Sequence, residues 1–218
     1  MADLRTEEEQ IEAIKGWWKE NGRSTVLGVT LAVVAVFGWR TWQEHQVNQA
    51  EAASLLYQNL SATIQVQPGE ALPSERRATA VHLAGQLKSE FGDSAYAQFA
   101  ALWLAKAAVD AEDLATARAE LQWVLDQQPE VTLAEVARQR LARVLAATGE
   151  LDQALAALGA APVAGFEADY YEIRGDILLQ QGKRDEARSA YRNGLSLAGE
   201  QPRPILSIKL DDLAVGEG

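Results

Sequence analysis

The hydrophobic pattern divides the chain into one unbroken apolar run and a much longer stretch of helical periodicity. Ser24–Trp39 is the run, sixteen residues without a charge, flanked by Arg23 and Arg40. As a helix it extends about 24 Å at roughly 1.5 Å per residue, less than a hydrocarbon core of about 30 Å. The flanking arginines can extend to the headgroups, and Trp42 occupies a position typical of tryptophan at the membrane–water interface. With these flanking residues the helix is long enough to cross the bilayer. We therefore predict a transmembrane helix over residues 23–42.

The charges around this run indicate its orientation. Only Arg40 follows the run closely, whereas four basic residues precede it, namely Arg5, Lys15, Lys19 and Arg23. The positive-inside rule then places residues 1–22 in the cytoplasm and the rest of the chain in a bacterial periplasm. The alternatives are a buried core helix and a signal peptide cleaved near Ala50–Ala52. The long polar segment before the run disfavours a signal peptide.

Small residues line one face of the predicted span. Gly28, Ala32 and Ala35 follow one another at i+4 and i+3. Such a stripe permits close packing against another membrane helix. The competing interpretation is that glycine and alanine are simply common in membrane spans.

Beyond Trp42 the chain is rich in alanine and leucine at helical spacing, with breaks at glycine and proline. This pattern predicts an all-α fold, with a helical extension and linker over residues 43–72 and the main domain over 73–218. We expect helices at about 73–91, 94–110, 113–127, 132–147, 151–159, 167–181 and 184–198. Residues 205–213 fit both a strand and a short helix, and we favour a helix that covers the apolar end of the array.

A repeat is visible within the main domain. Ala117, Ala154 and Ala187 each lie five positions after a predicted turn and are 37 and 33 residues apart. This spacing resembles the tetratricopeptide repeat, in which a small residue lets two helices cross closely and a glycine ends the first helix. Gly182 fits that pattern, whereas Glu112 replaces the turn glycine of the first repeat. The predicted fold is a single transmembrane helix followed by a short α-solenoid of degenerate tetratricopeptide-like repeats.

The segment between span and array carries an apolar stripe at heptad spacing, formed by Ala50, Ala53, Tyr57, Leu60 and Ile64. Two heptads are few for a coiled coil. We therefore favour packing of this stripe onto the helix that begins near Ser74, with dimerisation as the alternative.

Charge and reactive side chains argue against several classes of function. The net charge is −11, of which −10 falls after Trp42, so the positive surface that nonspecific nucleic-acid binding needs is missing. The chain has no cysteine, and its two histidines, His45 and His82, lack the spacing of a metal site. No serine-hydrolase motif or phosphate-binding loop occurs, and adjacent carboxylates are typical of solvated helix ends. We expect no catalytic residue, no cofactor and no metal.

Repeat arrays bind partners on a concave surface lined by the first helix of each pair. Here the candidate groove runs from apolar through basic to acidic: Phe99, Leu102, Lys106, Gln139, Arg143, Glu172 and Asp176. A segment with an apolar stripe and a basic end would complement it, unless a neighbouring helix of the chain covers the groove. Trp103 and Trp123 fall outside the usual core positions. They are candidate interface anchors, with packing against the preceding helix as the alternative.

Residues around the span carry a family resemblance. Its most specific run is Gly38-Trp39-Arg40, Trp42 and His45-Gln46-Val47, and further matches extend to Ile208-Lys209-Leu210-Asp211-Asp212-Leu213 near the C-terminus. In these residues the chain resembles the YfgM-type ancillary subunits of the bacterial SecYEG translocon. The resemblance implies a single-span inner-membrane protein with a periplasmic tetratricopeptide-like domain, associated with SecYEG and the chaperone PpiD. It implies help to newly translocated proteins and supplies no catalytic residues.

These observations favour a non-enzymatic, membrane-anchored binding protein, an accessory of the translocon that also meets translocating polypeptides. A signal-cleaved periplasmic repeat adaptor or a regulator of envelope assembly is the second hypothesis. An enzyme is the third, and no motif indicates its reaction.

Overall fold

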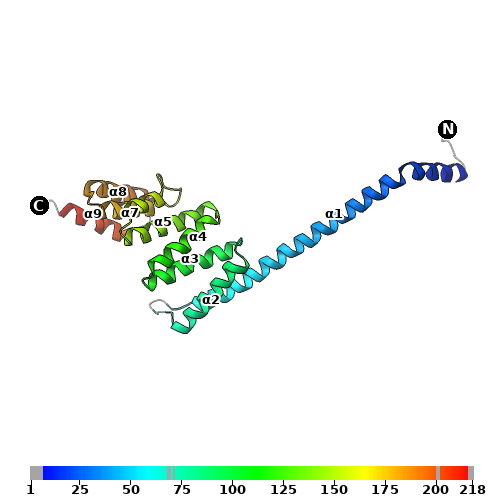
Figure 1. Ribbon diagram of the computed structural model, residues 1–218. Helices are drawn as coiled ribbons and strands as arrows, with labels where there is room; N and C mark the ends of the chain where they lie inside the picture. The colour runs from blue at the N-terminus through cyan, green and yellow to red at the C-terminus, as the bar shows by residue number, and fades with distance from the viewer. Residues whose placement is uncertain (1–6, 68–69, 71, 200–201, 216–218) are drawn as a thin grey trace. The chain divides into compact units, whose positions relative to one another are not determined.

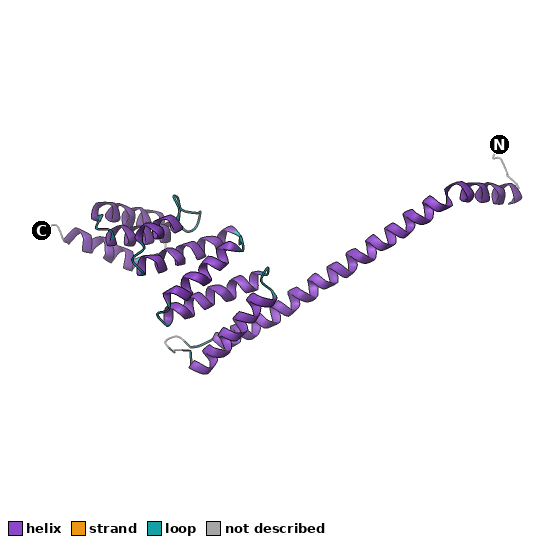
Figure 2. Ribbon diagram, viewed as in Figure 1, coloured by secondary structure: helices purple, strands orange, loops and turns teal. Residues whose placement is uncertain are grey.

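The computed structural model describes residues 7–67, 70, 72–199 and 202–215, and within these ranges all regular secondary structure is helical (Figure 2). The chain divides into two compact units, residues 1–52 and 53–218. Helix α1 (Glu7–Ile64) forms the first unit and contributes its last twelve residues to the second (Figure 1).

Helix α1 contains the predicted span without interruption. It begins at Glu7, well before the span, and continues past Ala50–Ala52 to Ile64. Among the described residues, α1 is the one helix long and apolar enough to cross a membrane, and only 6% of its most apolar window is buried. A core helix of a soluble domain would bury this window, so the core-helix interpretation is wrong.

The second unit contains all seven helices expected from the sequence, each ending within one residue of its predicted bounds. They are α2 (Ser74–Glu90), α3 (Ala95–Asp110), α4 (Leu114–Asp126), α5 (Val131–Ala147), α6 (Leu151–Leu158), α7 (Glu167–Gln180) and α8 (Arg184–Leu197). A further helix, α9 (Pro204–Val215), includes residues 205–213. It buries Leu206 and Leu213 against α8 and α7, which confirms a helix that covers the end of the array.

The repeats are helix pairs that pack on one another in chain order. Helices α3 and α4, α5 and α6, and α7 and α8 form the pairs, and each pair packs against the next (Figure 1). One alanine from the second helix of each pair is fully buried: Ala117, Ala154 and Ala187. These are the small residues at which the helices of a pair cross.

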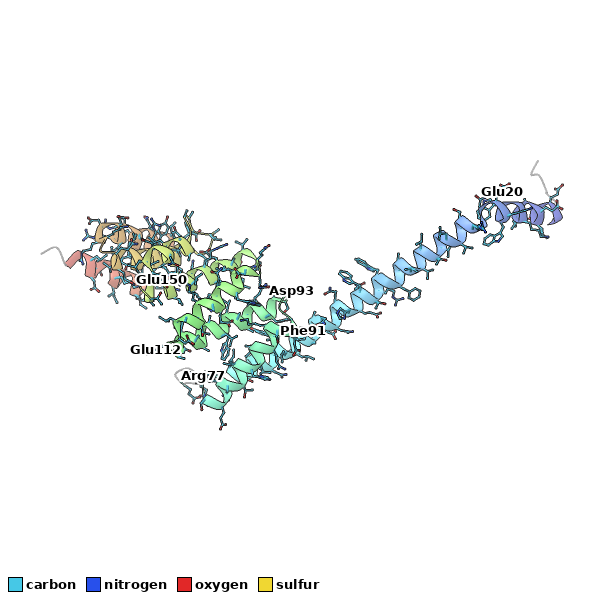
Figure 3. The ribbon with its side chains drawn as sticks, viewed as in Figure 1. Glu20, Arg77, Phe91, Asp93, Glu112 and Glu150 are labelled. Atoms are coloured by element: carbon cyan, nitrogen blue, oxygen red, sulfur yellow. The ribbon has the colours of Figure 1, made fainter. Side chains whose placement is uncertain are left out.

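The turn within each pair has one conformation. Glu112, Gly149 and Gly182 adopt left-handed backbone, with φ of 61°, 81° and 78°. The next N–H donates at 2.9 Å to the carbonyl five residues earlier, in the bonds Asp113 to Ala108, Glu150 to Leu145 and Lys183 to Leu178. This is one helix-ending motif used three times. Figure 3 labels Glu112 and Glu150 at two of these turns.

The C-terminal end of α1 is part of the second unit. Ala53 and Leu60 are buried against α2 and α3, and the ring of Tyr57 lies 5.3 Å from that of Tyr96. Arg76 of α2 donates from Nη2 to the carbonyl of Thr63 at 2.7 Å, which satisfies a backbone acceptor that a helix end leaves free. Packing of the heptad-spaced stripe onto α2 is thereby confirmed, although Ala50 itself is exposed.

Exchange of residues between equivalent turns tests the shared motif. We expect Glu112→Gly to stabilise the domain by about 0.5–1 kcal/mol. Left-handed backbone costs a residue with a side chain roughly 1–2 kcal/mol, and the greater conformational entropy of glycine in the unfolded chain offsets part of the gain. Gly182→Glu is expected to destabilise it by a similar amount. Urea unfolding of the full chain in detergent measures both, and shifts of the same sign would contradict a common turn.

Candidate partner-binding groove

A pocket opens between α3, α4 and α5 with a volume of about 380 Å³. Its lining is mostly apolar and consists of Ala105, Lys106, Val109, Leu114, Leu121, Arg140, Arg143, Val144 and Ala147. Lys106 and Arg143 were predicted from the repeat register as groove residues, and the structure brings them together here. The pocket can therefore accept an apolar side chain beneath basic groups.

Two arginines of α5 make the pocket's rim electropositive. Arg140 extends from α5 toward α3, where its Nη1 lies 3.5 Å from the carbonyl oxygen of Leu102. Burial lowers the pKa of Arg140, and the like charge of Arg143 lowers it further. Lys106, by contrast, is paired with Asp110 at 2.5 Å. An anionic group beside the two guanidinium groups would relieve their repulsion.

Arg140 was missed at the sequence level. It occupies the sixth position of its repeat, outside the positions that line an ideal groove. The same position holds Trp103 in the first repeat, a residue that does stand out from the core pattern. The sequence therefore drew attention to the sixth position where it holds a tryptophan, but not where it holds Arg140.

The acidic end of the predicted groove is covered by the chain itself. Arg203, just before α9, places Nη1 2.6 Å from Oδ1 of Asp169. Lys209 of α9 places Nζ 2.8 Å from a carboxylate oxygen of both Glu172 and Asp176. A helix with an apolar stripe and basic residues does complement these carboxylates, and that helix is α9.

The ion pairs perturb the groups that form them. The hydrogen bond from Arg203 is the largest cause that lowers the pKa of Asp169. Burial works against the charged form of Lys209, but its bonds to Asp176 and Glu172 outweigh that effect and raise its pKa. Burial, together with a 2.8 Å hydrogen bond from its hydroxyl to Asp176, raises the pKa of Tyr191. Charged Asp169 and Lys209 are thus the forms that hold α9.

The other predicted groove residues lie elsewhere. Leu102 and Gln139 are buried, and Gln139 donates to the buried carboxylate of Glu135 at 3.0 Å. Phe99 is exposed and its ring lies 6.0 Å from that of Tyr57 at the end of α1. The seven candidates therefore have four different surroundings. Lys106 and Arg143 line the pocket, Leu102 and Gln139 are buried, Glu172 and Asp176 pair with α9, and Phe99 lies beside Tyr57 of α1.

Both candidate anchor tryptophans are partly buried. Trp103 and Trp123 pack against the cluster formed by α1, α2 and α3. Lys88 Nζ lies 4.8 Å from the centre of the Trp123 ring and 2.6 Å from Oε2 of Glu120. The structure thus packs both side chains against this cluster and places Trp123 in contact with α2.

The small-residue stripe of α1 is open. Gly28, Ala32 and Ala35 are exposed, and a Cβ added at Gly28 would meet no atom within 4 Å. Elsewhere in the described residues, no group of three or more histidine and carboxylate side chains is arranged to hold a metal ion.

The fold defines a class of protein, an α-helical repeat domain that follows one helix long enough to cross a membrane. A family model described as a tetratricopeptide repeat-like domain matches residues 15–215. The chain belongs to that family, which confirms the repeat assignment made from the alanine spacing.

Curated relatives match over their whole length. The chain is 34% identical to the ancillary SecYEG translocon subunit of Escherichia coli K12 and 30% identical to the protein of that name from Haemophilus influenzae. These matches cover 99% and 98% of this chain and 100% of each relative. A Neisseria gonorrhoeae protein with the same name is 28% identical over 98% of this chain. The resemblance found around the span is confirmed. No solved structure gives a significant match.

The lowered pKa of Asp169 predicts how stability changes in acid. A carboxyl group with a depressed folded pKa contributes stability above its unfolded value, about 3.9, and loses it as the pH falls through the folded value. We expect Asp169→Asn to cost roughly 1 kcal/mol at pH 7, since the pair is partly exposed, and progressively less as the pH falls below the unfolded value. Urea midpoints across this range measure the difference.

Asp185 supplies the control, because its side chain is 94% exposed. Asp185→Asn should cost much less stability than Asp169→Asn at pH 7, because the contact of Asp185 with Arg188 is long, at 3.9 Å. A cost of Asp169→Asn that stays constant as the pH falls would show that its charge does not hold α9.

Proposed function

We propose that this chain is a non-enzymatic, single-span accessory subunit of the SecYEG translocon in the bacterial inner membrane. The observation that supports it most directly is the exposed apolar stretch of α1 in a chain that matches ancillary translocon subunits from end to end. A soluble protein would bury such a stretch, whereas a bilayer covers it without further contacts.

In this proposal the N-terminus is cytoplasmic and the repeat domain periplasmic, as the basic residues before the span favour. The family resemblance adds the chaperone PpiD as a partner and assistance to newly translocated proteins as the role. The physical advantage of the anchor is effective concentration. A domain confined to the membrane beside the translocon meets emerging chains even when each contact is weak.

The surface offered to partners is the pocket between α3, α4 and α5. It combines an apolar floor with the guanidinium groups of Arg140 and Arg143. Both features suit a peptide segment that inserts an apolar side chain and carries a nearby carboxylate. The acidic carboxylates of α7 are already occupied by Arg203 and Lys209.

The small-residue face of α1 gives a test of translocon association. The double variant Gly28→Leu, Ala32→Leu should reduce recovery of SecYEG with the protein at least several-fold, because the added side chains hold a neighbouring helix away. Thr30→Leu with Val33→Leu, on the other face of α1, is the control and should leave recovery unchanged. Equal recovery with both double variants would contradict packing through this face.

Photocrosslinking tests the pocket. A photoreactive residue at Lys106 or Arg143 should trap PpiD or a translocating chain in cells, because both positions line the open pocket. Ala119, exposed on α4 and outside the pocket lining, is the matched control and should trap neither. Equal labelling from Arg143 and Ala119 would exclude the pocket as the binding surface.

A further inference from the structure

The part of α1 that precedes the span carries apolar surface to which the proposed function gives no role. Ile11, Ile14, Trp17 and Trp18 are 50%, 67%, 52% and 54% exposed. The centres of the two indole rings lie 6.3 Å apart. These four side chains form a continuous apolar surface on a segment that also holds most of the N-terminal charges.

The segment is amphipathic. At about 100° per residue, Ile11, Ile14 and Trp18 fall on one stripe and Trp17 lies beside it, so the apolar arc covers roughly 120°. Lys15 and Lys19 follow along one border of that arc. The opposite side contains Gly16 and three acidic residues, Glu9, Glu12 and Glu20. This arrangement is typical of helices that lie in a membrane interface.

The backbone changes course where this segment meets the span. Figure 3 shows α1 turning close to the labelled Glu20. Thr25 Oγ1 donates to the carbonyl of Asn21 at 2.9 Å, and a hydroxyl bonded in this way bends a helix. At Gly22 an added Cβ would lie 3.2 Å from the Trp18 ring, so the indole packs directly over the glycine. A bend at glycine lets the two parts of α1 take different directions.

We propose that residues 9–21 of α1 lie along the membrane surface as an interfacial helix, with Ile11, Ile14, Trp17 and Trp18 inserted among the phospholipid headgroups. This inference rests on the membrane span of the proposed function, because the span keeps the segment at the bilayer. Lys15 and Lys19 then lie level with the phosphates and the acidic face points to water. Burial of large apolar side chains supplies the main stabilisation, and tryptophan favours this depth in the bilayer.

A phospholipid surface fits better than a protein partner. The apolar surface leads directly into the span, so the bilayer is its neighbour without any association step. The lysines border the apolar arc and the carboxylates avoid it, which matches an anionic interface. Partner proteins in the same plane, including a second copy of the chain, are separate outcomes of the test.

The absence of cysteine from the sequence permits a direct experiment. Single variants Ile14→Cys, Gly16→Cys and Leu31→Cys are placed in the full chain, one copy per nanodisc of phosphatidylethanolamine and phosphatidylglycerol. Labelling by a water-soluble maleimide is then followed over time. Gly16 tolerates the change because no atom lies within 4 Å of an added Cβ, and it is only two residues from Ile14.

We expect Ile14→Cys to be labelled at least about tenfold more slowly than Gly16→Cys, since tenfold corresponds to only ~1.4 kcal/mol and burial of one such side chain contributes at least as much. Equal rates at the two positions, with Leu31→Cys protected, would overturn the interfacial helix and leave the span intact. Rapid labelling of Leu31→Cys would instead refute the span. Protection of Ile14→Cys that appears only at two copies per disc would assign the apolar face to self-association.

Discussion

Close approach of paired helices is the constraint on which the repeat domain depends. Ala117, Ala154 and Ala187 have no exposed surface at the crossings, so a larger side chain there would force two backbones apart. The third pair also depends on a glycine, because a Cβ at Gly175 would lie 2.3 Å from the ring of Tyr191. The pairs then pack on one another in chain order, and the pocket lies between α3, α4 and α5.

The sequence was sufficient for the helices because their ends are determined locally. A left-handed residue followed by a bond to the carbonyl five residues back ends a helix in the same way at Gly149 and Gly182. At Glu112 the chain adopts that conformation without glycine, which shows that packing of the pair outweighs a local preference of about 1 kcal/mol. Repeat spacing located this turn although its residue type gave no sign of it.

Groove membership was less predictable because it depends on contacts between helices that are distant in the sequence, such as those of Lys209 with Glu172 and Asp176. The register of an ideal repeat placed Gln139 in the groove, but the side chain is buried beside Glu135. The second pair departs from the ideal repeat, since α6 has only eight residues and the chain after it returns so that Tyr170 bonds the carbonyl of Gly159 at 3.0 Å. The fifth position is also buried in the first pair, at Leu102, whereas Arg140 and Arg143 both line the pocket. Repeat spacing alone does not specify such contacts.

Segregation of charge decides which part of the surface remains open. The net charge of −10 beyond Trp42 favours basic partners in general. The carboxylates of α7 that could attract them are bound by Arg203 and Lys209 of the same chain. An intramolecular helix acts at an effective concentration in the millimolar range, so a basic peptide must compete with α9 before it can bind there. Arg143 also helps to lower the pKa of Asp169, although the hydrogen bonds of that carboxylate go to Arg203. In the proposed function, the guanidinium groups at the pocket select a carboxylate even though the domain as a whole is acidic.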